Sequence, residues 1–163
     1  MSDDYVLFSE NLDLSEDPKQ RQAEKDWLTE ALEADKGTQQ KTYNFLKKKM
    51  GLNLMDLEDF TSWTNFEWGW EEEDALWMYS EENGSIDNVA SLVQGFFKHF
   101  NYKCIFTLQW AHTCSKPYVG AFGGGVIAVT AETMIAHTTS HVARLLEIEV
   151  KKAERRLKRS KKT

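Results

Sequence analysis

The stretch from Cys104 to Thr130 has the sequence CIFTLQWAHTCSKPYVGAFGGGVIAVT, and it decides the fold. Its first part alternates with the two-residue period of a strand. One face carries Cys104, Phe106, Leu108, Trp110, His112 and Cys114, and the other carries Thr107, Gln109, Ala111 and Thr113. The segment VIAVT from Val126 is β-branched and follows glycine, which favours a second strand. We therefore predict an antiparallel hairpin whose loop runs from Ser115 to Gly125.

The strongest helix signal lies just before this hairpin. Ser85 is a good N-cap, and the residues after it recur on one apolar face at steps of three and four: Ile86, Val89, Ala90, Val93, Phe97 and Phe100. Further upstream, two alternating segments, residues 66–70 and 76–79, predict a hairpin whose turn holds four acidic residues. The resulting order β-β-α-β-β-α predicts an α+β fold with a mainly antiparallel, four-stranded sheet, preceded by N-terminal helices and followed by a long C-terminal helix.

The two ends of the chain favour helices around this core. We expect helices after Asp17-Pro18 and after Thr38, ending at Gly37 and Gly51, and a third at residues 54–60. The third helix is acidic, which argues against a DNA-reading helix-turn-helix. Near Tyr5 the pattern leaves an edge strand and a tethered arm as alternatives. We divide the chain into an acidic arm and helical subdomain (1–60), an α+β core (61–135) and a C-terminal helix with a basic tail (136–163).

The last predicted helix carries a short apolar seam that begins after Thr138 to Ser140. Its members follow steps of three and four: Ala143, Leu146, Val150, Ala153 and Leu157. The seam leaves two alternatives open, packing against the body of the protein or a homodimer through this helix.

Charge and composition limit the classes of partner. The chain has 163 residues and a net charge of −6, but residues 151–163 carry +7 and residues 1–150 carry −13. Nucleic acid is therefore an unexpected partner except through the basic tail. No apolar run is long enough for a membrane span, and the acidic N-terminal residues do not form a signal peptide, so we expect a cytoplasmic setting and no membrane contact.

Candidate chemistry is sparse. In a strand, His112 and Cys114 are too far apart for direct activation of a thiol, and His137 and His141 lack further metal ligands. We predict no catalytic residues, no metal and no cofactor, and hence a protein that is not an enzyme. The long loop leaves three alternatives: a structural turn, a protein contact, or an anion site formed by Lys116, Gly123, Gly124 and Gly125. It contains no GxxxxGK[ST] phosphate motif.

Acidic and aromatic residues gather near the first hairpin. Aromatic side chains beside charges are typical of protein interfaces. We therefore predict a partner-binding surface that combines this hairpin with the long loop: Trp68, Trp70, Glu71, Glu72, Glu73, Trp77, Lys116, Tyr118 and Phe122.

The segments WAHTCSKP (110–117), FGGG (122–125) and Val129-Thr130 resemble a group of small, uncharacterised proteins of phages and other mobile elements. The resemblance covers residues 66–132 and implies a setting rather than an activity. It favours a non-enzymatic protein-binding factor that inhibits or modulates a host system, in defence or nucleic-acid processing, through a host or phage protein. The alternative is a small-molecule or nucleotide-binding protein that uses the glycines and Lys116.

Overall fold

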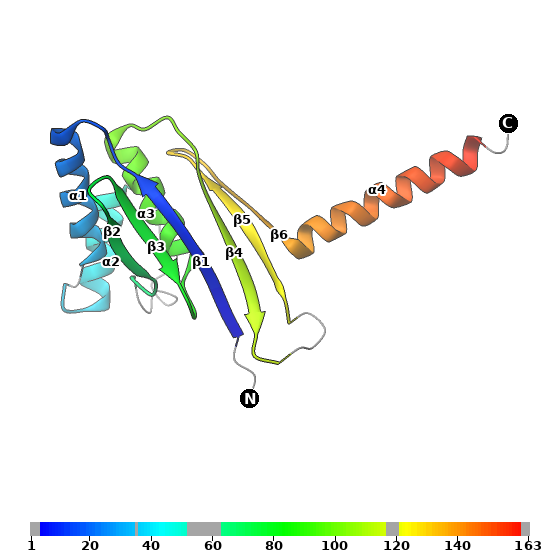
Figure 1. Ribbon diagram of the computed structural model, residues 1–163, viewed down its shortest axis with the longest axis horizontal. Coiled ribbons are helices and arrows are strands. Elements are labelled where there is room, and N and C mark those ends of the chain that lie inside the picture. Colours follow the sequence, from blue (N-terminus) through cyan, green and yellow to red (C-terminus); the bar gives the residue numbers. More distant parts are fainter. Residues whose placement is uncertain (1–3, 35, 52–62, 117–120, 161–163) are drawn as a thin grey trace.

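The computed structural model describes residues 4–34, 36–51, 63–116 and 121–160 (Figure 1). Within these ranges, six antiparallel strands form one sheet in the order β2-β3-β1-β4-β5-β6. The strands are β1 (Asp4–Asp13), β2 (Glu67–Glu71), β3 (Ala75–Ser80), β4 (Phe106–Cys114), β5 (Gly123–Val129) and β6 (Met134–Thr138). The helices are α1 (Pro18–Leu32), α2 (Gln39–Met50), α3 (Ile86–Phe100) and α4 (Thr139–Ser160).

The α+β class is confirmed, but the predicted number of four strands and the prediction that helices precede every strand are wrong. The first element is a strand, and it lies inside the sheet. β1 pairs with β3 from Phe8↔Ser80 to Asp13↔Ala75, and with β4 from Asp4↔Cys114 to Leu7↔Ala111. It is therefore neither the edge strand nor the arm expected near Tyr5. Its apolar run is short because Ser9 and Asn11 lie on the open side of the sheet and Glu10 lies between Phe8 and Leu12 on the other side.

β6 is the second strand missing from the predicted sheet. It pairs with β5 from Val129↔Met134 to Gly125↔Thr138 and forms an edge. Every residue from Ile135 to Thr138 is exposed, so the strand lacks the apolar alternation on which a sequence prediction depends.

Local capping accounts for the helix starts, which agree with the predictions. The side chain of Asp17 accepts a hydrogen bond from the Gln20 amide at 3.0 Å, and that of Ser85 accepts one from the Asn88 amide at 3.2 Å. Gly51 ends α2 in the left-handed conformation, as expected. α1, however, ends at Leu32 and not at Gly37, and the predicted helix at 54–60 falls outside the described residues.

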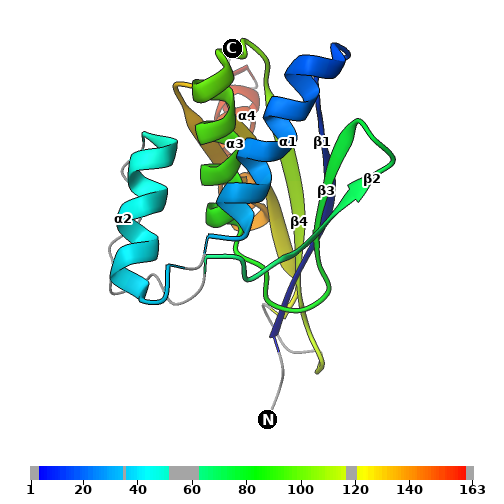
Figure 2. The ribbon, with the colours of Figure 1, turned by 90° about the vertical axis from the view of Figure 1, so that its left-hand side faces the viewer.

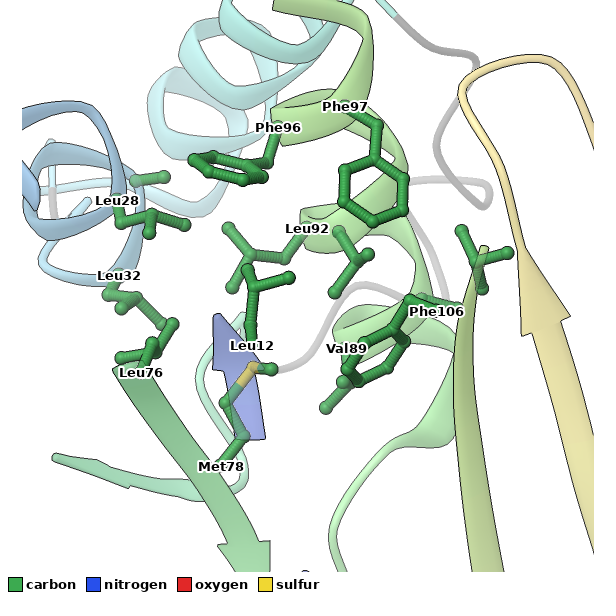
Figure 3. Close-up of a cluster of buried hydrophobic side chains, with 14 of the residues drawn as sticks. Leu12, Leu28, Leu32, Leu76, Met78, Val89, Leu92, Phe96, Phe97 and Phe106 are labelled. Carbon is green, nitrogen blue, oxygen red and sulfur yellow. The ribbon is translucent and has the colours of Figure 1, made fainter. Parts of the chain in front are cut away.

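The helices α1, α2 and α3 lie on one face of the sheet (Figure 2). The core forms between them and the strands, where α3 contributes Leu92 and Phe96 and the strands contribute Leu12, Leu76 and Met78 (Figure 3). Each of these five side chains is at most 3% exposed. Burying a large apolar side chain contributes about 1.5 to 3 kcal/mol, so this layer dominates the stability of the fold.

The opposite face of the sheet has no described helix over it. Its residues Ser9, Asn11, Gln109, Val126 and His137 are all exposed. α4 follows β6 directly and extends away from the sheet (Figure 1). Within the described ranges, no helix combines the length and the hydropathy that crossing a bilayer requires.

Candidate protein-binding surfaces

The open face of the sheet carries an aromatic pair on β3. Strand register places Tyr79 opposite Glu67 and Ser9, and Trp77 opposite Gly69 and Asn11. The rings of Trp77 and Tyr79 stack with centroids 3.9 Å apart and an interplanar angle of 17°. Trp77 is 38% exposed, and its indole N–H donates to Ser9 Oγ at 2.9 Å. The ring is therefore held in one orientation while its face stays accessible.

Carboxylates surround this pair on the same face. We name as the Trp77 face Trp77 and Tyr79 of β3, Glu67 and Glu71 of β2, and Ser9, Asn11 and Asp13 of β1. The Asn11 side-chain amide donates to the Glu71 carboxylate, which links β1 to β2 across β3. None of the six described strands contains Lys or Arg. The Trp77 face therefore combines an aromatic centre with negative charge.

The sheet separates Trp77 from the other two tryptophans predicted to join it. Trp68 and Trp70 pair with the buried residues Met78 and Leu76, so their side chains lie on the helix-covered face. Their rings meet edge to face at 6.3 Å, and the Lys25 Nζ lies 5.3 Å from the Trp70 ring. Both tryptophans are partly buried and pack against the core.

The predicted acidic turn and the predicted loop also lie far apart. Glu72 and Glu73 are exposed in the β2–β3 turn, next to the Asp13 end of β1. Lys116 follows the end of β4 that pairs with Asp4. Asp4 and Asp13 are the two opposite ends of β1. Because β1 has 10 residues, about 30 Å of strand separates the two regions. Phe122, just before β5, is 64% exposed, and Tyr118 lies outside the described residues.

The three glycines belong to strand β5 rather than to a loop. Gly123, Gly124 and Gly125 pair with His112, Ala111 and Trp110 of β4. A Cβ atom on Gly125 would lie 2.5 Å from a ring carbon of Trp110 and 2.5 Å from the His137 carbonyl oxygen. Gly124 has a φ of 149°, which other residues rarely adopt. These glycines admit the Trp110 indole and the close approach of β6, and no described contact favours an anion on them.

A cavity that sequence reasoning missed lies where β1 and β4 separate. Their described pairing ends at Leu7↔Ala111, although β1 continues to Asp13 and β4 begins at Phe106. The cavity there has a volume of about 590 Å³ and is lined by Glu10, Leu12, Gln20, Tyr102, Cys104 and Phe106, among others. This size is within the range of small-molecule sites.

A buried carboxylate stands behind this cavity. Glu24 of α1 is 0% exposed and accepts hydrogen bonds from the Ser15 amide at 2.8 Å, Gln20 Nε2 at 2.9 Å and the Tyr102 hydroxyl at 2.7 Å. Burial, and then the hydrogen bond to Glu24, raises the pKa of Tyr102 to about 12. Burial also raises the pKa of the Cys104 thiol. The sequence signal was available, because Glu24 is four residues before Leu28 on the apolar stripe of α1.

A second groove, of about 520 Å³, lies at the base of α4. Its lining includes Trp110 and Val126 from the sheet and Val142, Ala143 and Leu146 from α4. Nearby, the rings of His137 and His141 have centroids 4.8 Å apart. Across the described chain, no three or more His, Cys, Asp or Glu residues group so as to hold a metal ion.

Comparison with known proteins adds no relative: no family model, no curated protein and no solved structure matches this chain. The resemblance to phage and mobile-element proteins therefore stays a prediction.

Proposed function

We propose that this protein is a non-enzymatic protein-binding factor that captures a basic segment of its partner on the Trp77 face. One observation carries the proposal: a stacked, accessible Trp77–Tyr79 pair stands among carboxylates on a sheet face that no described helix covers.

The aromatic pair would supply most of the contact energy. Tryptophan and tyrosine are enriched among the residues that dominate protein interfaces, because they bury a large area and lose little conformational freedom. The hydrogen bond from Trp77 to Ser9 and the stacking on Tyr79 fix the indole before a partner arrives. Binding therefore costs little further ordering of this side chain.

The surrounding charge would select the partner. Glu67, Glu71 and Asp13 lie on the face itself, and Glu72 and Glu73 extend the negative charge into the adjoining turn. Lysine or arginine side chains of a partner would pair with these carboxylates through their charged groups and pack their aliphatic stems on Trp77. A second cation could instead lie over the Trp77 ring. Complementary charge of this kind raises the association rate and suppresses wrong partners.

The biological setting rests on the resemblance alone. It favours a phage or mobile-element factor that acts in the host cytoplasm by inhibiting or modulating a host defence or nucleic-acid-processing protein. The Trp77 face would be the part that engages that protein.

Affinity capture from host lysate, followed by mass spectrometry, tests the proposal with matched variants. Trp77→Ala and Glu71→Lys should each lose the proteins that the wild-type chain retains. Glu33→Lys makes the same charge change at an exposed position on the helix side, and it should retain them. If all four proteins retain the same set, the Trp77 face is not the binding surface.

A further inference from the structure

α4 presents an apolar stripe that its own chain leaves uncovered. We name as the α4 stripe Val142, Leu146, Val150 and Ala153, which follow one another at helical steps of four, four and three. Leu146 is 60% exposed and Val150 58% exposed, and every residue from Thr139 to Arg156 is exposed. α4 contacts β5 and β6 near its start, and the rest extends away from the sheet (Figure 1).

The connection to β6 explains this exposure. β6 ends at Thr138 and α4 begins at Thr139, so there is no loop in which the chain could turn back onto the sheet. A helix of 22 residues spans about 33 Å, and isolated helices are marginally stable in water. The α4 stripe therefore needs a cover from outside its own chain.

We propose that α4 pairs antiparallel with α4 of a second copy of this chain, in a two-fold dimer. The stripes of the two helices face each other. A two-fold pairing covers both stripes with the same contacts and closes on itself.

The positions of the charges favour a protein partner over a membrane surface. Glu147, Glu149, Glu154 and Arg156 flank the stripe, whereas Arg144, Lys151 and Arg155 lie on the opposite side of the helix by its periodicity. On an anionic bilayer the three flanking carboxylates would lie at the headgroups, which would repel them. The net charge of −6 on the whole chain would also be repelled by such a surface.

The same charges favour the antiparallel orientation. Glu149 and Arg156 lie seven residues apart on one flank of the stripe, and Glu149 also pairs with the exposed Lys152 of its own helix at 2.8 Å. Antiparallel pairing places Glu149 of each copy opposite Arg156 of the other, whereas parallel pairing places Glu149 opposite Glu154. Because α4 extends away from the sheet (Figure 1), antiparallel pairing also puts the two sheets at opposite ends of the helix pair. On the other flank Glu147 then meets Glu154, which limits the affinity.

Sedimentation equilibrium of the full chain tests the pairing. The wild-type protein should show twice the chain mass of 18.9 kDa at high concentration. The double variant Leu146→Glu/Val150→Glu should be monomeric with an unchanged melting temperature for the sheet and α1–α3. Arg155→Glu, on the far side of the helix, should leave the dimer intact. A wild-type chain that stays monomeric up to millimolar concentration overturns the proposal.

Charge exchange tests the orientation. Glu149→Arg should raise the dimer Kd about tenfold, because each pair turns from attraction to repulsion, and Glu149→Arg/Arg156→Glu should restore it. Glu147→Lys should tighten an antiparallel dimer and leave a parallel one unchanged. A monomer that instead co-sediments with phosphatidylserine vesicles would assign the α4 stripe to a membrane surface and contradict the pairing.

Discussion

α3 and α4 are both amphipathic helices, but the protein treats them in opposite ways. In α3, nine of 15 residues are buried, and the fully buried Phe96 packs against Trp27 of α1. In α4, every residue from Thr139 to Arg156 is exposed. The difference teaches that helical periodicity predicts a face to be covered and does not predict what covers it. α3 is connected by loops that return it to the sheet, whereas α4 continues straight from an edge strand.

The largest effect on the free energy of unfolding should come from removing a buried side chain of α3. Phe96→Ala in α3 removes a fully buried ring that packs against Trp27, with ring centroids 6.0 Å apart. We expect a loss of about 3 to 5 kcal/mol in the free energy of unfolding, measured by urea denaturation. The matched change Leu146→Ala in α4 should cost less than about 1 kcal/mol in the dilute monomer. Equal losses would mean that α4 is packed as α3 is.

A buried carboxylate gives the next largest contrast. Glu24→Ala leaves the Ser15 amide and the Tyr102 hydroxyl without their buried acceptor, and it should lower the free energy of unfolding by about 3 kcal/mol. Glu147→Ala on exposed α4 should change it by less than about 0.5 kcal/mol. Thermal melts of the two variants check this, and a Glu24→Ala protein as stable as the wild type would show that water replaces the carboxylate.

Strand β5 contacts both α3 and α4, and the stability of the fold should be sensitive to a single methyl group added there. Gly125→Ala places a Cβ against the Trp110 ring and the His137 carbonyl, and we expect a loss of about 1 to 3 kcal/mol. Gly69→Ala, in β2, meets nothing within 4 Å and should be neutral or slightly stabilising. Chemical denaturation distinguishes the pair; indifference at Gly125 would contradict the close approach of β6.

The sequence predicted the elements whose apolar residues recur with a regular period and missed two strands in which this period is broken. The hairpin of β4 and β5, the hairpin of β2 and β3, and helix α3 all follow from apolar periodicity. β1 was missed because Glu10 interrupts its core-facing side between Phe8 and Leu12. β6 was missed because each of its residues after Met134 is exposed. Periodicity alone gives no strand order, so it could not place β1 between β3 and β4.

The candidate surfaces divide in the same way. Trp77 was predicted as a contact residue, and it lies on the open face. Trp68 and Trp70 alternate with the wrong parity to join it, a fact visible in the sequence once residues 66–70 and 76–79 are paired. The cavity beside Tyr102 depends on where β1 and β4 separate, which is a long-range property, although Glu24 on an apolar stripe indicated a buried polar contact.

The smallest expected effect is a pH dependence of the melting temperature that arises from Tyr102, in the part of the protein covered by helices. The pKa of Tyr102 is raised from 10.0 to about 12 by burial first and by Glu24 second, so the folded chain keeps a proton that the unfolded chain releases. The stabilising contribution is fully present below pH 10 and is lost as the pH rises through about 12. Between these limits the melting temperature of the wild type should fall more steeply than that of Tyr102→Phe, which keeps the ring and lacks the titrating hydroxyl. Tyr79→Phe, on the open face, is the control and should fall like the wild type. If the melting temperatures of the wild type and Tyr102→Phe fall with pH at the same rate, the Tyr102 hydroxyl reaches water in the folded protein. The covered and open regions would then not differ in how their tyrosines affect the pH dependence of stability.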